Sequence, residues 1–181
     1  HYGQGYQVGS PADQMRGQIM SRITALRMLC DHPQLLVDSA EKFAEQHGEG
    51  SEYAFALKEQ GLLENFKSNK LEAVVQYVEE HLEVDENSKV VIFTTYLGML
   101  PLLEEALAKK KIKSTPYSGL MNAKEKEASK TLFQTSKEIK VLISTDAGGY
   151  GVDLPQANLL VNYDLPWSAG TAVQRNSRIR R

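Results

Sequence analysis

Hydrophobic and polar residues are arranged differently on the two sides of residue 68. In the first part, apolar residues recur every three or four positions: Met15, Ile19, Ile23, Leu26 and Leu29. This spacing predicts an amphipathic helix. Ser10 as the N-cap and Pro11 at the first helical position set its start, and Pro33 limits its end.

The remainder of the first part is polar and less regular. It contains a helix predicted near residues 38–46, a glycine-containing break at 47–51 and a short helix at 52–60. The first residues are rich in Gly, Gln and Tyr. We therefore expect a flexible leader over residues 1–12 and a helical segment over residues 13–67.

From Ser68 onward, apolar runs typical of strands alternate with helical patterns. Ser68 is placed to cap a helix, and Asn122 with Glu125 three residues later forms a capping-box pattern. The strands and extended stretches are predicted at 90–93, 112–117, 140–144 and 159–163, and the later helices at 98–110, at 122–133 and near the end. This alternation implies an α/β domain over residues 68–181, with a parallel sheet covered by helices on both faces.

Composition narrows the classes of protein to consider. Hydrophobic residues make up 41% and charged residues 24% of the chain, as in soluble globular proteins. The net charge of −2 gives no global attraction to nucleic acid, so a nucleic-acid site has to be a local patch. One such patch runs from Leu165 to Arg181, with four arginines and no acidic residue.

Several other classes of site are disfavoured. The single cysteine, Cys30, excludes an internal disulfide and a cysteine-cluster zinc site. The four histidines lie far apart, without metal-ligand spacing, so no metal site is expected. No apolar run approaches the roughly 20 residues that span a bilayer. We expect an intracellular protein, in the cytoplasm or the nucleus or nucleoid, without membrane contact.

Polar residues follow the predicted strands at their carboxyl ends, where parallel sheets hold their ligands. They form a rim of hydroxyl-bearing residues, one glycine and two aspartates: Thr94, Thr95, Tyr96, Ser118, Gly119, Thr145, Asp146 and Asp164. The alternative for each of them is ordinary turn chemistry, since Ser, Thr, Gly and Asp favour strand-to-helix loops.

Two linked segments near the end of the chain are suited to phosphate. The apolar run 141–143 leads into a Gly-rich loop, Ser144 to Leu154, and an arginine cluster follows at residues 174–181. Glycines let backbone N–H groups approach an anion, and guanidinium groups bind phosphate bidentately. A dinucleotide-binding oxidoreductase is disfavoured, because its Gly-rich loop follows the first strand rather than a late one.

Four segments together resemble the second RecA-like lobe, or helicase C-terminal domain, of superfamily-two DNA translocases of the Swi/Snf type. Leu26 to Pro33 is similar to the L-R-x-x-C-x-H-P segment that opens that lobe, with Cys30 and His32 expected to be packed and inert. Residues 90–96, 144–154 and 174–181 resemble the fourth, fifth and sixth motifs in the correct order. The resemblance implies a RecA-like α/β fold for residues 68–181.

The resemblance also implies roles on the ATP side. Arg178 and Arg181 would be arginine fingers, and their i, i+3 spacing would put them on one face of a helix. Nucleotide contacts would come from Gln174, Arg175, Gly151 and Asp153. ATP and Mg²⁺ would be held mainly by a first lobe of the same polypeptide, because no G-x-x-x-x-G-K-[ST] loop occurs here. This chain alone is therefore expected to be inactive.

On the opposite rim the resemblance implies phosphate contacts to double-stranded DNA: Thr94, Thr95, Gly119, Thr145 and Gly148. Such contacts position a strand without reading its sequence. We expect a monomer, of which this chain is a part that is cut just after the sixth motif. Trp167 is expected in the core beside Pro166, with a stacking platform for a base as the alternative.

Two departures from the family pattern keep other functions open. Ser177 replaces a glycine of the sixth motif, which affects the loop geometry more than the arginines. Asp153 stands where the family often has Asn, and aspartate there resembles DEAD-box helicases, so an RNA helicase lobe is one alternative. The other is a non-catalytic interaction module that retains the fold.

Overall fold

The computed structural model describes residues 10–45, 51–64, 67–146 and 153–179. Most of the expected leader lies outside these ranges, as do three predicted site residues, Gly148, Gly151 and Arg181. The chain divides into two compact units, His1–Lys67 and Ser68–Arg181, here called the helical unit and the sheet unit. Each unit is described by itself.

The helical unit contains α1 (Pro11–Asp31), α2 (Gln34–Glu45) and α3 (Glu52–Glu59). The predicted start of α1 is confirmed: the Ser10 hydroxyl accepts a hydrogen bond from the Asp13 N–H at 3.2 Å, and the capping box is complete. α2 begins four residues before the predicted 38, because His32 Nδ1 accepts the Gln34 N–H at 3.1 Å directly after Pro33. A small core joins the three helices: Ala25, Leu36, Ala40, Ala54 and Leu63.

The apolar stripe of α1 is exposed. Met15 is 64% exposed, Ile19 51% and Leu26 58%, whereas the buried residues of α1 are Ala25 and Asp31. Cys30 is exposed as well, so the expectation that it is packed is wrong. The periodicity therefore predicted the helix correctly but not which of its residues are buried.

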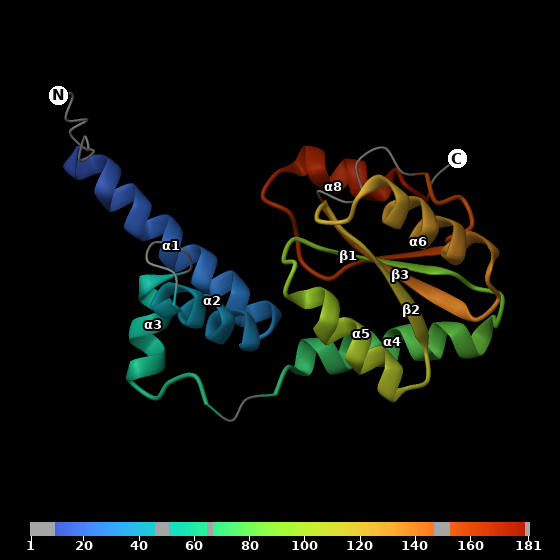
Figure 1. Ribbon diagram of the computed structural model, residues 1–181, viewed down its shortest axis with the longest axis horizontal. Coiled ribbons are helices and arrows are strands. Elements are labelled where there is room, and N and C mark those ends of the chain that lie inside the picture. Colours follow the sequence, from blue (N-terminus) through green and yellow to red (C-terminus); the bar gives the residue numbers. More distant parts are fainter. Residues whose placement is uncertain (1–9, 46–50, 65–66, 147–152, 180–181) are drawn as a thin grey trace. The chain divides into compact units, whose positions relative to one another are not determined.

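The sheet unit begins with α4 (Asn69–Val84) and alternates strands with helices (Figure 1). Its elements are β1 (Val90–Thr94), α5 (Met99–Lys109), β2 (Lys113–Tyr117), α6 (Ala123–Thr135), β3 (Ile139–Thr145), β4 (Leu159–Asn162) and α8 (Ala169–Asn176). The strands form a parallel sheet in the order β2-β3-β1-β4. The predicted RecA-like α/β fold is confirmed.

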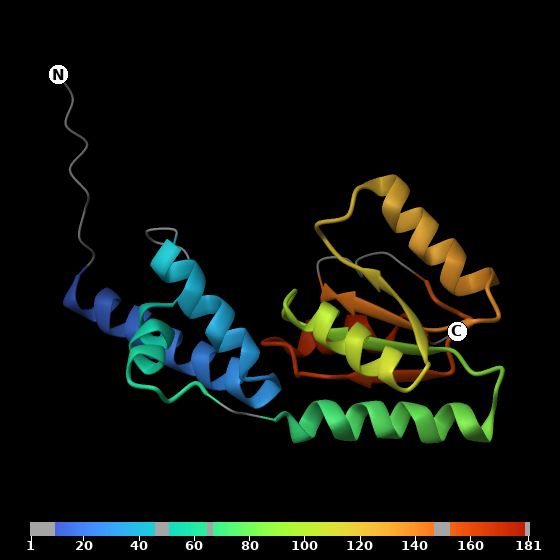
Figure 2. The same cartoon turned by 60° about the horizontal axis from the view of Figure 1, so that its bottom comes forward.

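The central strand β1 is buried along its whole length, because strands flank it and helices cover both faces of the sheet. α4 and α5 lie on one face, and α6 and α8 lie on the other (Figures 1 and 2). On the α6 face, Val91 and Phe93 of β1 pack with Leu142 and Phe133. Removing these side chains from water supplies the main favourable term for folding of this unit.

Local capping sets the helix boundaries of the sheet unit. The hydroxyl of Ser68 accepts the Leu71 N–H at 3.2 Å, and Asn122 and Glu125 form a complete capping box. Both features were predicted and are confirmed. No helix within the described ranges is long and apolar enough to span a membrane.

A buried lysine binds three backbone carbonyl groups at the amino end of the sheet. The Lys89 ammonium, one residue before β1, donates to the carbonyl oxygens of Phe133, Ser136 and Ile139 at 2.7, 2.5 and 2.6 Å. These carbonyls lie at the end of α6 and the start of β3. Lys89 therefore fixes the turn that leads from α6 into β3.

Candidate functional site

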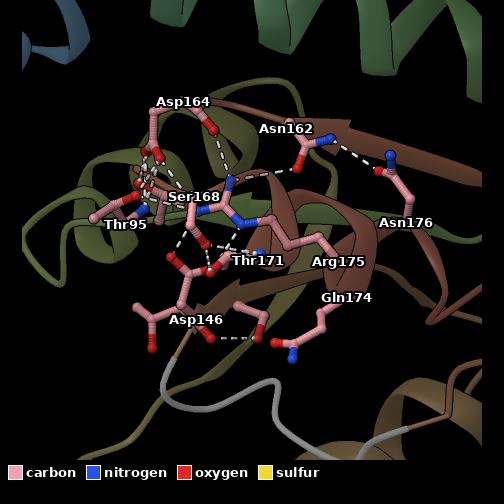
Figure 3. A network of polar contacts seen from close by, with 12 residues as sticks. Thr95, Asp146, Asn162, Asp164, Ser168, Thr171, Gln174, Arg175 and Asn176 are labelled. Carbon is pink, nitrogen blue, oxygen red and sulfur yellow. Dashed lines mark hydrogen bonds and ion pairs between the residues drawn. The ribbon is translucent and has the colours of Figure 1, made fainter. Parts of the chain in front are cut away.

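The carboxyl ends of β1, β3 and β4 meet at one edge of the sheet because the three strands are parallel and in register. Thr94 pairs with Thr145, and Phe93 pairs with Asn162. The residues that follow each strand are therefore brought together, although 80 positions separate Thr95 from Arg175 in the sequence. The resulting cluster of polar side chains is shown in Figure 3.

Arg175 of α8 lies at the centre of this cluster and is only 2% exposed. Its Nε and Nη2 donate to the two carboxylate oxygens of Asp146 at 2.6 and 2.9 Å. Its Nη1 donates to the Asp164 carbonyl at 2.6 Å and to Asn162 Oδ1 at 3.3 Å. Nη2 also reaches Thr95 Oγ1 at 3.2 Å and Asp164 Oδ1 at 3.3 Å. Every nitrogen of the guanidinium is thus hydrogen-bonded within the protein.

The Asp164 carboxylate links the end of β1 to this cluster by accepting hydrogen bonds from Thr94 and Thr95. Its carboxylate accepts the hydroxyl groups of Thr94 at 2.6 Å and Thr95 at 2.5 Å. The Thr95 N–H donates to both carboxylate oxygens at 2.9 Å. Charge-assisted bonds of this kind are the strong ones in proteins. The carboxylate is therefore well satisfied despite its burial.

Two carboxylates face one guanidinium in this cluster. Burial acts to lower the pKa of Arg175, but the hydrogen bond and charge of Asp146, together with Asp164, outweigh it and raise the pKa above its ordinary value. Arg175 is therefore charged at every pH at which the protein is folded. Among the described residues, no group of His, Cys, Asp and Glu side chains is placed to hold a metal ion.

The helix that carries Arg175 ends sooner than predicted. α8 is capped at its start by Ser168, whose hydroxyl accepts the Thr171 N–H at 3.1 Å, and its last residue is Asn176. Ser177 is the C-cap, and its hydroxyl donates to the Gln174 carbonyl at 2.8 Å. The expectation that Arg178 lies on this helix is therefore wrong, because the helix ends before it, and Arg181 lies outside the described residues.

The Gly-rich segment and the arginine cluster meet through their backbones. The Leu154 N–H donates to the Arg178 carbonyl at 2.9 Å, and the Arg178 N–H donates to the Arg175 carbonyl at 3.1 Å. Ile179 packs against the core cluster that contains Leu154. Arg178 is therefore held beside the residue that follows Asp153.

The predicted nucleotide-side residues differ in their exposure to solvent. Gln174 and Asp153 are exposed, and Arg178 is half-buried. Arg175 is buried with its donors occupied, so a contact from it to a nucleotide would require breaking the cluster. Their nucleotide contacts stay predictions, and the geometry favours Asp153 and Arg178 over Arg175.

The predicted phosphate-side residues are also divided by burial. Thr94 and Thr145 are buried, at 0% and 3% exposure, and the Thr94 hydroxyl donates a hydrogen bond to Asp164. Thr95 is half-buried, and Gly119 is exposed after β2. Phosphate contact stays a prediction for this set. The side chains of Thr94 and Thr145 cannot reach a phosphate without a rearrangement.

Sequence reasoning missed two features at this edge. It assigned no role to Asn162, the last residue of β4, although polar residues at strand ends are the available signal. It also placed Trp167 in the core, which is wrong, since Trp167 is 57% exposed. Leu165, in the same loop, is 75% exposed.

Comparison with known proteins identifies a family model that matches residues 69–181, described as the helicase conserved C-terminal domain. An uncharacterized ATP-dependent helicase, YqhH, of Bacillus subtilis is 38% identical over 107 residues, which cover 59% of this chain and 18% of that protein. A DNA repair and recombination protein RAD54-like of Gallus gallus is 30% identical over 168 residues, covering 90% of this chain and 22% of that protein. The chain thus spans about a fifth of the length of these relatives.

Among solved structures, the SWI2/SNF2 ATPase C-terminal domain of Sulfolobus solfataricus superposes with a TM-score of 0.60. The match covers 87% of this chain and 58% of that chain at 24% sequence identity. It therefore supports the fold.

Proposed function

Since the chain belongs to the family of helicase conserved C-terminal domains and resembles those of Snf2-type proteins, we propose that it is the second motor lobe of an ATP-dependent DNA translocase. In this proposal the lobe supplies arginine fingers to ATP bound on a first lobe. It also contacts the phosphate backbone of double-stranded DNA without reading its sequence.

The observation that carries the proposal is the hydrogen bond between the Leu154 N–H and the Arg178 carbonyl. It joins the fifth-motif segment to the sixth-motif segment where Asp153 is exposed and the Arg178 side chain is half-buried. We expect Arg178 and Arg181 to stabilise the charge on the γ-phosphate in the transition state. Arginine fingers contribute about 10³–10⁵ to the rate in related phosphoryl transfers.

The remaining nucleotide contacts follow from the same surface. Asp153 and Gln174 are exposed: the carboxylate can accept a hydrogen bond from a ribose hydroxyl, and the amide of Gln174 can donate to a phosphate or a ribose oxygen. Mg²⁺ and the phosphate-cradling loop would come from the first lobe, since this sequence has no G-x-x-x-x-G-K-[ST] segment. The chain would therefore complete an ATP site rather than form one.

On the nucleic-acid side, the proposal relies on the exposed rim. Gly119 is exposed after β2. Thr95 and Tyr96 are half-buried at the end of β1, and their N–H groups donate to Asp164 and to the Thr94 hydroxyl. Thr94 and Thr145 would shape this rim from inside rather than touch the phosphates. Because phosphate contacts release counterions, binding should weaken steeply as the salt concentration rises.

The proposal is tested by measuring ATP turnover of the complete protein with duplex DNA, with single-stranded RNA and with neither. We expect stimulation by duplex DNA, and a loss of turnover in Asp153→Ala. Glu138→Ala is the matched control, because it removes an exposed acid just before β3, at the opposite end of the sheet from this surface.

Each alternative has its own outcome. Stimulation by RNA alone would assign the lobe to an RNA helicase, the alternative suggested by Asp153. Absence of turnover under every condition would favour an interaction module. Wild-type turnover in Asp153→Ala would refute the role given to this aspartate.

A further inference from the structure

We propose that Arg175 is a positioning residue that couples the nucleic-acid rim to the arginine fingers. Its buried guanidinium joins the ends of β1, β3 and β4 to the segment that carries Arg178 (Figure 3). This inference rests on the proposed function. It gives Arg175 a role different from the nucleotide contact that the sequence suggested.

Arg175 acts on neighbouring residues rather than on a ligand. Its side chain is 2% exposed, and all three of its guanidinium nitrogens donate to protein oxygens. A planar guanidinium can satisfy acceptors in several fixed directions at once, which an ammonium group cannot do. The residue is therefore suited to holding several segments in one relative position.

Backbone hydrogen bonds connect one end of the cluster to Arg178, the proposed arginine finger. The Arg175 carbonyl accepts the Arg178 N–H at 3.1 Å, and the Arg178 carbonyl accepts the Leu154 N–H at 2.9 Å. Because α8 ends at Asn176, Arg178 has no helix of its own to hold it. Its position depends on these backbone bonds, and thus on where Arg175 is anchored.

The other end of the cluster leads to the proposed nucleic-acid rim. Thr95 Oγ1 donates to Asp164 at 2.5 Å and accepts from Arg175 at 3.2 Å, so a shift of Thr95 disturbs both partners. Asp146, which accepts from two guanidinium nitrogens, directly follows the last residue of β3 and belongs to the Gly-rich loop. A phosphate bound at the end of β1 or β3 would therefore change the anchoring of Arg175.

Both ends share one acceptor, the Asp164 carboxylate, and this makes the coupling specific. Asp164 bonds Thr94 and Thr95 on one side and Arg175 on the other. Packed polar clusters of this kind change between discrete arrangements rather than deform continuously. We infer that nucleic acid on the rim favours the arrangement in which Arg178 reaches the ATP.

The test measures ATP turnover of the complete protein with and without saturating duplex DNA, for wild type, Asp146→Asn and Arg175→Lys. The informative quantity is the ratio of the stimulated to the unstimulated turnover number. We expect both variants to lower this ratio by about 5- to 30-fold, with the KM for ATP changed much less. Thr95→Val, which removes one hydroxyl from the cluster, should lower it in the same direction.

Lys89→Met is the control for a structural effect. It removes a buried cation at the other end of the sheet, so loss of folded protein should scale both rates together and leave their ratio unchanged. Circular dichroism of the complete protein reports whether each variant is folded.

The outcomes separate this inference from the proposed function. A wild-type ratio in folded Asp146→Asn and Thr95→Val, with normal stimulation of the wild type, overturns the coupling role alone. Absence of any stimulation in the wild-type protein overturns the proposed function and this inference with it. A reduced ratio in Lys89→Met equal to that in Asp146→Asn would also overturn the coupling role.

Discussion

Two buried cations lie at opposite ends of the same sheet and are satisfied in different ways. Lys89, 9% exposed at the amino end, donates to three neutral backbone carbonyls. Arg175, 2% exposed at the carboxyl end, bonds two carboxylates, a carbonyl, an amide oxygen and a hydroxyl. The first closes a turn, whereas the second joins segments that carry different motifs.

The pKa shifts of the two cations have opposite signs. Burial, with a smaller contribution from nearby Lys140, lowers the pKa of Lys89. Burial also disfavours charge on Arg175, but Asp146 and Asp164 outweigh it and raise its pKa. Burial therefore disfavours the charged form of Lys89, which has only neutral acceptors, whereas two carboxylates stabilise the charged form of Arg175. The contribution of each cation to the free energy of unfolding can be measured separately.

The largest effect is expected for Asp164→Ala. It leaves the Arg175 guanidinium buried with one carboxylate partner fewer and also removes the acceptor of Thr94 and Thr95. Breaking a buried ion pair in this way costs about 3–5 kcal/mol. Urea unfolding of the chain measures this change in the free energy of unfolding. A loss below that of Lys89→Met would contradict the ranking of the two cations.

A smaller effect is expected for Lys89→Met. The substitution leaves three carbonyl oxygens without their donor, but it also removes a charge whose burial is unfavourable. We expect a loss of about 1–3 kcal/mol in the free energy of unfolding. The same urea titration measures it, and an unchanged midpoint would show that the ammonium group contributes nothing to the turn.

The lowered pKa of Lys89 also predicts a pH dependence. As the pH falls through the ordinary value near 10.4, the unfolded chain takes up this proton before the folded protein does. Wild-type stability should therefore rise relative to Lys89→Met as the pH increases through the window between the folded pKa and that value. Parallel unfolding curves at several pH values test this, and a difference that falls with pH would contradict it.

The smallest effect is expected at an exposed cation. Lys113 pairs with Glu138, and their side chains are 62% and 71% exposed. Exposed pairs are screened by water and contribute little. Lys113→Ala should leave the urea midpoint unchanged within error, and a shift as large as that of Lys89→Met would mean that burial is not what distinguishes these cations.

The elements of the sheet unit were predictable because their signals are local. The capping box of Asn122 and Glu125, the N-cap Ser68 and the apolar run of β1 each act within a few residues of the sequence. The order of motifs along the chain then indicated the family. The alternating pattern also predicted a parallel sheet, but it did not predict the strand order β2-β3-β1-β4.

The strand ends predicted that Thr94, Thr95, Asp146 and Asp164 gather on one rim. The contacts of Arg175 with this rim were not predictable, because they join residues 11, 29 and 80 positions apart. Spacing alone does not tell that Arg175 faces the sheet while Arg178 follows the end of α8. The exposed stripe of α1 has the same cause: periodicity identifies a helix face but not what covers it. The prediction that Trp167 is buried was wrong because it rested on the hydrophobicity of the side chain and not on the conformation of its loop.

The most direct test of the motor-lobe assignment is the rate of ATP hydrolysis by the complete protein at saturating duplex DNA, for wild type, Arg178→Ala and Arg181→Ala. Arg16→Ala, an exposed arginine of α1, is the matched control. We predict duplex-stimulated turnover in wild type and control, and a loss of about 10³-fold or more in both finger variants. Equal turnover in all four proteins would contradict the claim that this lobe supplies the arginine fingers.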